Sequence, residues 1–299
     1  MQEKAKDVVI DSDVYNECDD LWALSYLLAS DEEINVKGIY IAPFMNYRVE
    51  STSESIDKSY EVCQKLLCLA GKEKYRDKVY KGAREFMTAA GCAVASEAVD
   101  HLIEEAKTHT AENPLYVIEI AAMMNIASAL TIAPEIAEKI VVVWLGGNAL
   151  HWPDQWEFNM RGDTMASNVL LKSDVRLVIL PCMGVVSAFL STEPELRFRI
   201  GGKNALCDWL IEETKLFRGQ FNPDPFPWSV VFWDVTAVAY VLDKEKKFML
   251  SKEEKRPILN EDWTFSYDGN KKIEYVFHID RDVLMNDLFN KLSKYRDKE

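Results

Sequence analysis

The sequence predicts an α/β fold, with an open, mostly parallel, doubly wound sheet flanked by helices. Three observations predict it. Short runs rich in Val and Ile alternate with helical patterns along most of the chain. Those runs are mostly continuous stretches of apolar residues, which is typical of strands buried on both faces of a parallel sheet. No internal repeat or low-complexity linker interrupts the alternation. A chain with this pattern is expected to form one sheet between two helical layers.

The strands are predicted, in chain order, from apolar runs that are rich in β-branched residues. These runs are residues 7–10, 34–43, 114–121, 140–147 and 175–181, followed by a late strand near 273–280.

The helices are predicted between and after these strands, where apolar residues recur at helical spacing. They cover residues 19–29, 54–70, 96–109, 162–172 and 229–243, with two short helices starting at Asn125 and Pro134 and a closing helix from Arg281.

The length and the connections favour a single domain. A chain of 299 residues fits one large α/β domain or two small ones. The segment 219–229 is dense in Pro and aromatic residues and is interpreted as an ordered loop, not as a domain boundary. We therefore predict one domain over residues 1–299.

Composition excludes several classes of partner. The formal charge of −14 argues against nucleic acid and anionic membranes, which demand clustered Lys and Arg, whereas a neutral or cationic ligand is easier to accommodate. The N-terminus has no apolar signal-like region, and no apolar stretch is of membrane length. The six cysteines form no CxxC pair, so buried thiols in a reducing cytoplasm are expected.

An unusual concentration of acids follows the first predicted strand. Asp11, Asp13, Glu17, Asp19 and Asp20 fall within ten positions. Ligands of such sheets bind where strands end and helices begin. Asp19 and Asp20 would also stabilise the first turn of the next helix through its dipole, which is the structural alternative. Five acids this close raise one another's pKa and cost stability, and a hard divalent cation such as Ca²⁺ or Mg²⁺ would relieve the repulsion.

A strand that ends in Asp-x-Asp also opens phosphatases of the haloacid dehalogenase type. Their fingerprint continues to a Thr or Val, where this chain has Tyr15. Their phosphate-holding Lys and Ser or Thr have no clear counterparts downstream. That class is the weaker interpretation of the acids.

Four further segments lie at predicted strand ends. They carry Asn46, Met124-Asn125, Glu157-Phe158-Asn159 and Asp234. Together with the acids, they resemble the inosine-uridine-preferring nucleoside hydrolase family over nearly the whole chain. The family opens with Asp-x-Asp-x-Gly-x-Asp-Asp, and its Leu-Thr-Asn-Ile-Ala is similar to Met-Met-Asn-Ile-Ala here. This chain lacks the Gly and has two extra residues between the second and third acids.

The resemblance implies the nucleoside hydrolase fold and hydrolysis of the N-glycosidic bond of ribonucleosides to ribose and free base. It implies Ca²⁺ held by Asp13, Asp20, Asp234 and the backbone carbonyl of Met124. Asp13 would also act as general base on a metal-bound water. Ribose would be held by the remaining motif residues, Asp19, Asn46, Glu157 and Asn159.

The family's leaving-group acid is missing. The position that holds His in the family is Trp233 here, which can stack on a base but cannot donate a proton at neutral pH. Of the four His, His101 and His109 fall on a predicted surface helix and His278 lies in the late strand. We therefore expect His151, near Glu157, to protonate the base.

Two alternatives remain open at this point. The substrate could be another N-ribosyl compound, or the chain could be a non-catalytic, metal-dependent protein that binds ribose or a nucleoside. A small-molecule nucleoside is the expected partner, and a homodimer or homotetramer the expected assembly.

Overall fold

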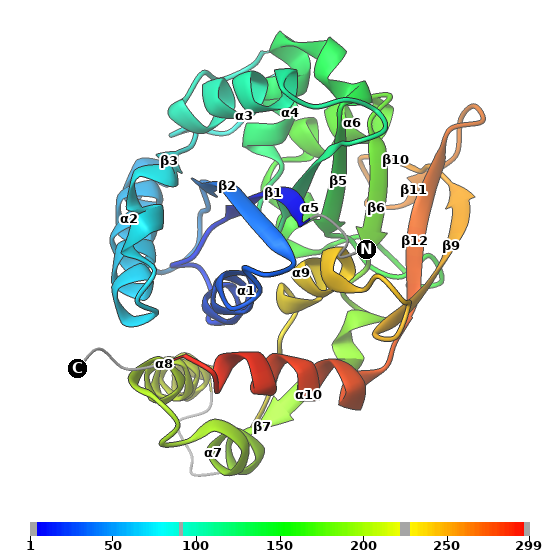
Figure 1. Ribbon diagram of the computed structural model, residues 1–299. Coiled ribbons are helices and arrows are strands. Elements are labelled where there is room, and N and C mark those ends of the chain that lie inside the picture. The colour runs from blue at the N-terminus through cyan, green and yellow to red at the C-terminus, as the bar shows by residue number, and fades with distance from the viewer. Residues whose placement is uncertain (1–4, 90–91, 222–227, 296–299) are drawn as a thin grey trace.

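An eight-stranded sheet forms the centre of the molecule (Figure 1). The computed structural model describes residues 5–89, 92–221 and 228–295. The strand order is β3-β2-β1-β4-β5-β6-β12-β9, in which every neighbouring pair is parallel except the last, β12 with β9. The open, mostly parallel sheet is thus confirmed.

Six strands of the central sheet agree with the predicted apolar runs, whereas β3 and β9 were not predicted. The central sheet consists of β1 (Lys6–Ser12), β2 (Ile34–Ile41), β3 (Val79–Lys81), β4 (Leu115–Glu119), β5 (Ile140–Leu145), β6 (Arg176–Leu180), β9 (Met249–Lys255) and β12 (Lys272–Ile279). Two antiparallel pairs lie outside it: β7 (Leu190–Thr192) with β8 (Ser229–Val231), and β10 (Ile258–Leu259) with β11 (Phe265–Ser266).

The helices occupy the segments between strands. They are α1 (Asp19–Leu28), α2 (Thr52–Leu69), α3 (Glu97–Lys107), α4 (Met124–Ile132), α5 (Phe158–Gly162), α6 (Thr164–Lys172), α7 (Glu193–Ile200), α8 (Ala205–Phe221), α9 (Val235–Leu242) and α10 (Arg281–Leu292). Short 3₁₀ turns occur at Glu73–Lys78, Pro134–Glu138 and Val186–Ala188.

Each face of the sheet packs against its own helical layer. Val8 and Ile10 of β1 belong to the core beneath α1, α9 and α10, whereas Val9 belongs to the core beneath α3, α4 and α6. Successive side chains of a strand point to opposite faces, so an all-apolar strand supplies both cores. Figure 1 shows these two layers on opposite sides of the sheet.

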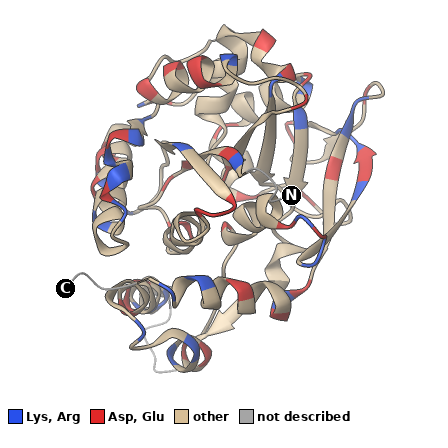
Figure 2. Ribbon diagram, viewed as in Figure 1, with Lys and Arg blue, Asp and Glu red and all other residues tan. Residues whose placement is uncertain are grey.

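The chain reverses its winding direction between β1 and β4. The strands β1, β2 and β3 extend to one side, and β4, β5 and β6 extend to the other. Such a switch point leaves a crevice at the carboxyl ends of the two central strands. In Figure 2 the acidic loop between β1 and α1 lies at this edge. Acidic and basic residues are mixed along α2, α7 and α10.

One predicted helix is partly wrong. The segment 229–243 was expected to be helical throughout, but its first residues form β8, paired with β7, and α9 begins only at Val235. The first residues, Ser-Val-Val-Phe-Trp, are β-branched and aromatic and suit a strand. In the predicted loop 219–229, residues 222–227 lie outside the described ranges.

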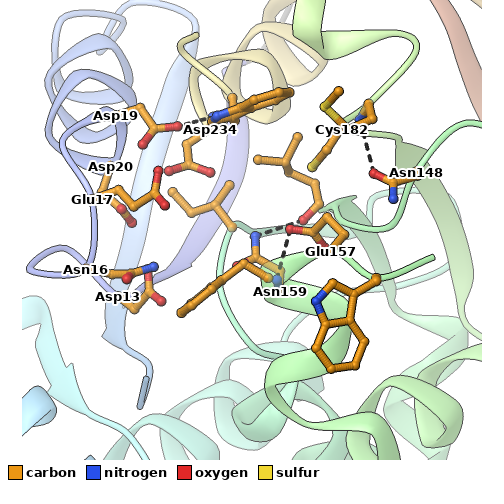
Figure 3. A pocket seen from close by; sticks show the side chains of 16 residues that line it. Asp13, Asn16, Glu17, Asp19, Asp20, Asn148, Glu157, Asn159, Cys182 and Asp234 are labelled. Atoms are coloured by element: carbon orange, nitrogen blue, oxygen red, sulfur yellow. Dashed lines mark hydrogen bonds between the residues drawn. The ribbon is translucent and has the colours of Figure 1, made fainter. Parts of the chain in front are cut away.

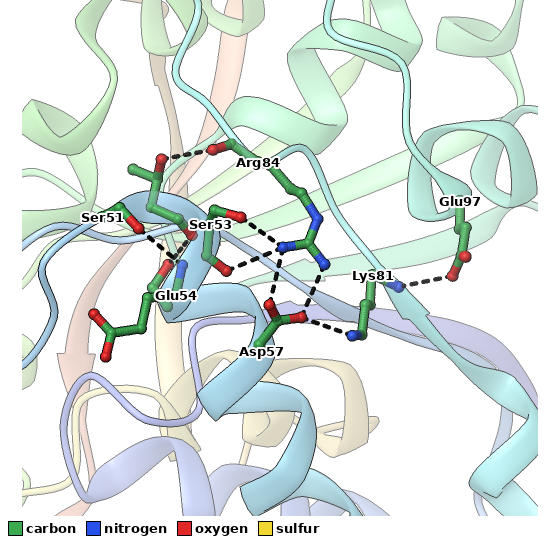
Figure 4. A network of polar contacts seen from close by, with 9 residues as sticks. Ser51, Ser53, Glu54, Asp57, Lys81, Arg84 and Glu97 are labelled. Carbon is green, nitrogen blue, oxygen red and sulfur yellow. Dashed lines mark hydrogen bonds and ion pairs between the residues drawn. The ribbon is translucent and has the colours of Figure 1, made fainter.

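The edge strand β3 is tied to α2 by charged side chains (Figure 4). Asp57 of α2 accepts hydrogen bonds from Arg84 Nη2 at 2.8 Å and from Lys81 Nζ at 2.7 Å. The Arg84 guanidinium, followed by Lys81, holds the pKa of Asp57 well below its usual range. All three side chains are largely exposed, so this network fixes position more than it adds stability.

In the described part of the chain, no helix has the length and apolar character needed to cross a bilayer. The cysteines are free, with Cys68 and Cys92 exposed and the other four buried.

Candidate active site

A pocket opens at the carboxyl ends of the central strands (Figure 3). It is lined by acids from the β1–α1 loop and from the start of α9, and by polar and aromatic residues from the segment after β5. Seven of the residues predicted for the site line it: Asp13, Asp19, Asp20, Glu157, Asn159, Trp233 and Asp234. The prediction that these separated motifs meet at one strand edge therefore agrees with the geometry.

The acids of the β1–α1 junction are buried. Asp13 follows the end of β1, and Asp19 and Asp20 form the first turn of α1, each with at most 2% of its surface exposed. The hydroxyl of Ser12 donates to Asp20 Oδ1 at 2.6 Å. The cap position of α1 is Cys18, which makes no side-chain capping bond. Asp19 is therefore the first residue of α1 and not its N-cap.

Asp234 completes a compact acidic group. Ligand oxygens of Asp19, Asp20 and Asp234 lie within 4.8 Å of one another. Asp234 stands at the N-cap position of α9, yet its carboxylate makes no capping bond, and its N–H donates to Asp19 Oδ2 at 3.3 Å. Figure 3 shows these three side chains pointing toward a common space. Their carboxylates thus lie close to one another.

Burial and mutual repulsion make these carboxyls hard to ionise. Burial, followed by the charge of Asp20, raises the pKa of Asp19 to about 7. Burial, followed by the charge of Glu17, raises the pKa of Asp20 to about 7. The pKa values of Asp13 and Asp234 are also raised well above their usual range, again by burial first and then by neighbouring acids.

These observations fit a hard divalent cation. Ca²⁺ and Mg²⁺ take carboxylate oxygens, and a cation at this place would relieve the repulsion among the acids. Asp13 Oδ2 is buried and has no hydrogen-bond partner among the described residues, so an acceptor faces the same pocket. The compact group contains Asp19, which was expected to hold ribose, and does not include Asp13, which was expected to ligate the metal.

The junction after β4 contributes Ile120 to the pocket lining, and Met124 is not among the lining residues. Met124 is the buried first residue of α4. The neighbouring Asn125 donates from Nδ2 to Asp11 Oδ1 at 3.0 Å and accepts from the N–H of Ala83. The backbone oxygen of Met124 stays a predicted ligand.

Asp11 lies beneath the pocket, paired with a second buried acid. Burial raises the pKa of Asp11 to about 7, and burial followed by the charge of Asp11 raises the pKa of Glu119 well above its usual value. Asp11 Oδ2 and Glu119 Oε2 are both buried without a hydrogen-bond partner among the described residues. Asp11 therefore positions the end of β1 and does not face the ligand space.

Glu157 and Asn159 form the opposite wall. Glu157 caps α5, since Oε1 accepts from the N–H of Asn159 and Oε2 from the N–H of Met160, both at 2.9 Å. Oε2 also accepts from Gly147 N at 2.9 Å. Gly147 has φ +70°, and a Cβ there would lie 2.7 Å from Met160 Cε, so this turn requires glycine. Asn159 Nδ2 donates to Leu145 O at 3.1 Å.

The substitution Glu157→Gln is expected to lower the free energy of unfolding by about 1–3 kcal/mol, because an amide NH₂ would face a backbone N–H that now donates to an oxygen. Urea unfolding monitored by circular dichroism measures this change in the free energy of unfolding. The control Glu138→Gln removes an exposed acid and should have no effect. Equal stability of the Glu157 variant and the wild type would contradict the capping role.

Besides Met124, two more predicted residues, Asn46 and His151, lie outside the pocket lining. Asn46 supports the lining residue Asn16, to whose Oδ1 it donates at 2.7 Å. His151 is exposed, and its ring lies beside Gly184, which follows the lining residue Met183. The structure therefore brings His151 near the rim but not into the lining.

The prediction that His101 and His109 lie at the surface was wrong. His109 is buried, with Nε2 3.2 Å from Asp7 Oδ2. His101 is half-buried, 2.9 Å from the Tyr40 hydroxyl and stacked on Tyr80. Both stabilise the layer that contains α3, away from the pocket.

Several lining residues were not predicted as site residues. They are Asn16, Glu17, Ile120, Leu145, Asn148, Trp156, Phe158, Cys182 and Met183. Asn16 and Glu17 fall in the stretch that carries the two extra residues of the acid motif, which was the available signal. Burial, followed by Asp19 and Glu157, raises the pKa of Glu17 to about 8.

Comparisons with known proteins identify a family model that matches this chain and solved structures with a similar fold. The model of the family described as inosine-uridine preferring nucleoside hydrolase matches residues 8–286. A purine-preferring ribonucleoside hydrolase from Gardnerella vaginalis has a similar structure, with TM-score 0.75 and 20% identity over 96% of this chain and 98% of that one. A plant nucleoside hydrolase gives TM-score 0.74 and 16% identity over 97% and 100% of the chains. An inosine-uridine preferring nucleoside hydrolase from Bacillus anthracis gives 0.72 and 17% over 97% and 100%. No curated protein matches the sequence.

Proposed function

Because the chain belongs to the inosine-uridine-preferring nucleoside hydrolase family, we propose that it hydrolyses ribonucleosides to ribose and free base with Ca²⁺ and with Asp13 as general base. It is a nucleoside hydrolase, so the alternative of a non-catalytic binding protein is set aside. The observation that supports the finer proposal is the buried group of carboxylates at the switch point of the sheet.

The metal is proposed to be Ca²⁺, held by Asp20, Asp234 and Asp13 together with the carbonyl of Met124. Asp19 belongs to the compact group and is the further candidate ligand that the geometry adds. When bound, such a cation lowers the pKa of a water molecule beside it. Asp13 accepts the proton of the attacking water, and its Oδ2, which lacks a partner among the described residues, is the atom free to do so.

The ribose is proposed to lie between the acids and the opposite wall. Glu157, Asn159 and Asp19 line both sides of the pocket at positions that hydroxyl groups can reach. Asn46 contributes by fixing Asn16. Negative charge around the ring favours the oxocarbenium-like transition state, in which positive charge builds on the sugar. Trp233 is proposed to stack on the base.

A panel of nucleosides tests this proposal. Inosine, uridine, guanosine, adenosine and cytidine would be incubated with the full chain and Ca²⁺, and ribose would be measured by a reducing-sugar assay. Release of ribose that disappears with a chelator and returns with Ca²⁺ is expected. No ribose from these nucleosides or from p-nitrophenyl riboside would contradict the proposal.

His151 is proposed as the donor of a proton to neutral bases, and His151→Ala should slow inosine and uridine more than p-nitrophenyl riboside. The reason is that p-nitrophenolate leaves without a proton, whereas a neutral base needs one. Initial rates at saturating Ca²⁺ measure the difference. Equal slowing of all three substrates would show that His151 donates no proton.

A homodimer or homotetramer and a cytoplasmic location remain predictions from the sequence.

A further inference from the structure

The pocket is lined by many acids and by no basic side chain. Six of the sixteen lining residues are carboxylates: Asp13, Glu17, Asp19, Asp20, Glu157 and Asp234. Among the described residues that line it, none is Lys, Arg or His. A single divalent cation would balance the charge of two ionised carboxyls. The other four carboxyls have no basic partner among the lining residues, so a ligand that brings positive charge would favour their ionised form.

Glu17 adds to this excess on the side of the pocket formed by the β1–α1 loop. Asp19 and Glu157 repel its charge, and Arg218 and Arg48 attract it from outside the lining. Arg48 is already engaged, since Nη1 donates to Asn16 O at 3.0 Å and its guanidinium lies 4.1 Å from the Tyr15 ring centroid. Both arginines lie outside the lining, and the contacts of Arg48 occupy its guanidinium.

The remaining lining suits a flat, positively charged ring. Trp156 and Trp233 both line the pocket, and indole is the best aromatic partner for a cation. The Trp156 ring already takes the Arg161 guanidinium at 5.0 Å from its centroid, so it accepts a cation in this environment. Cys182 and Met183 add polarizable sulfur to the same wall.

The lining also limits which bases can leave. A neutral base departs as an anion unless a proton reaches it, and the described lining residues offer no imidazole or ammonium donor. His151 lies outside the lining. A base that carries a fixed positive charge on the glycosidic nitrogen needs no donor.

We propose that the preferred substrates are ribosides with a cationic base, such as N-ribosylpyridinium compounds, which the acids and tryptophans of this pocket recognise. This inference rests on the proposed function. Water forms the new bond to C1′ while the C1′–N bond breaks and its electron pair goes to the nitrogen, which becomes neutral. The proton lost by the water passes to Asp13 and then to solvent. The products are ribose, neutral base and one proton.

The test compares four substrates with the full chain and Ca²⁺. Nicotinamide riboside is cationic, inosine and uridine are neutral, and p-nitrophenyl riboside is neutral but needs no proton for its leaving group. The value of kcat/KM for nicotinamide riboside is expected to exceed those for inosine and uridine by about a hundredfold, the scale of missing general acid catalysis. Values for inosine or uridine within about tenfold of it would overturn the inference.

The variant Glu17→Gln separates recognition of charge from an easy leaving group. The ratio of kcat/KM for nicotinamide riboside to that for p-nitrophenyl riboside should fall about tenfold, since a lining carboxyl that can pair with a cation is replaced by a neutral amide. The control Glu61→Gln makes the same change on exposed α2 and should leave the ratio unchanged. An unchanged ratio in Glu17→Gln would overturn the proposed recognition.

A second variant adds a proton donor to the pocket lining. Trp233→His places a titratable donor in the lining, and activity on inosine should rise relative to nicotinamide riboside. A further rise in the preference for the cation would overturn the inference. Hydrolysis of p-nitrophenyl riboside without preference for the cation refutes only the substrate class. Absence of hydrolysis with all four substrates refutes the proposed function, and the inference with it.

Discussion

Asp13→Asn is expected to reduce turnover by at least about a thousandfold while the protein stays folded. General base catalysis alone contributes about 10²–10⁴ in rate, and the same substitution would weaken a proposed metal ligand. Asparagine has nearly the shape of aspartate, so the packing around the end of β1 should persist. Initial rates on the best riboside, at saturating Ca²⁺, measure the effect.

The stability of this variant provides an independent check. Burial and the charge of Asp20 raise the pKa of Asp13 in the folded protein, so its ionised form costs stability. Without Ca²⁺, Asp13→Asn should therefore melt at a higher temperature than the wild type at pH 8. A variant that is inactive because it is unfolded would melt lower. Asp268→Asn, at an exposed position, serves as a control for loss of one acid.

Calorimetric titration with Ca²⁺ distinguishes the two roles of Asp13. Weaker binding together with lost activity would support both roles, and unchanged binding with lost activity would leave only the general base. Wild-type turnover by Asp13→Asn would show that the base has been assigned to the wrong residue.

The core of the fold could be predicted because the same property recurs along the chain. The apolar residues of the runs 7–10 and 140–147 are buried on both faces of the sheet, so a continuous apolar stretch corresponds directly to a central strand. The antiparallel edge strand β9 has a mostly polar sequence, Met-Leu-Ser-Lys-Glu-Glu-Lys, and only its pairing with β12 makes it a strand. Such edges carry little periodic signal.

The site residues could be predicted where the chemistry requires a residue type that few others can replace. Acids after a strand, and Asp at the start of an apolar helix, pointed to one edge of the sheet. Asn148 and Cys182 escaped notice because their roles depend on neighbours in space: Asn148 Oδ1 accepts from Met183 N at 3.2 Å, and the thiol hydrogen-bonds to Glu157. These contacts join residues that are far apart in the sequence, so the sequence alone does not indicate them.

In the protein without Ca²⁺, the free energy of unfolding is expected to fall as the pH rises from about 5 to about 8. Asp19 and Asp20 have pKa values near 7 in the folded protein, against 3.8 ordinarily. Below about pH 4 both are protonated in the folded and unfolded states. Between about 4 and 7 the unfolded chain loses these protons first, so the folded state binds more protons and stability declines with pH. Above about pH 8 the loss is complete.

Bound Ca²⁺ should offset most of that decline. The cation favours ionised carboxylates, so its binding strengthens with pH, and a ligand of the folded state stabilises it by mass action. The melting temperatures with Ca²⁺ and with chelator should therefore be close at pH 5 and separate by pH 8, by a free-energy difference on the order of several kcal/mol. The buried Asp11–Glu119 pair lies outside the proposed ligand set, so a residual slope should remain with Ca²⁺.

Asp20→Asn provides the matched comparison, because it removes one of the titrating carboxyls and one ligand. In this variant the chelated protein should show a shallower decline with pH and a smaller gain from Ca²⁺ than the wild type. Scanning calorimetry at pH 5, 6, 7 and 8, each with Ca²⁺ and with chelator, measures both. A chelated wild type that is more stable at pH 8 than at pH 5, or a gain from Ca²⁺ that is the same at every pH, would contradict a metal site built from these carboxyls. Mutual repulsion among Asp13, Asp19, Asp20 and Asp234 would then have to be relieved by protons alone, and the acids after β1 would need another explanation.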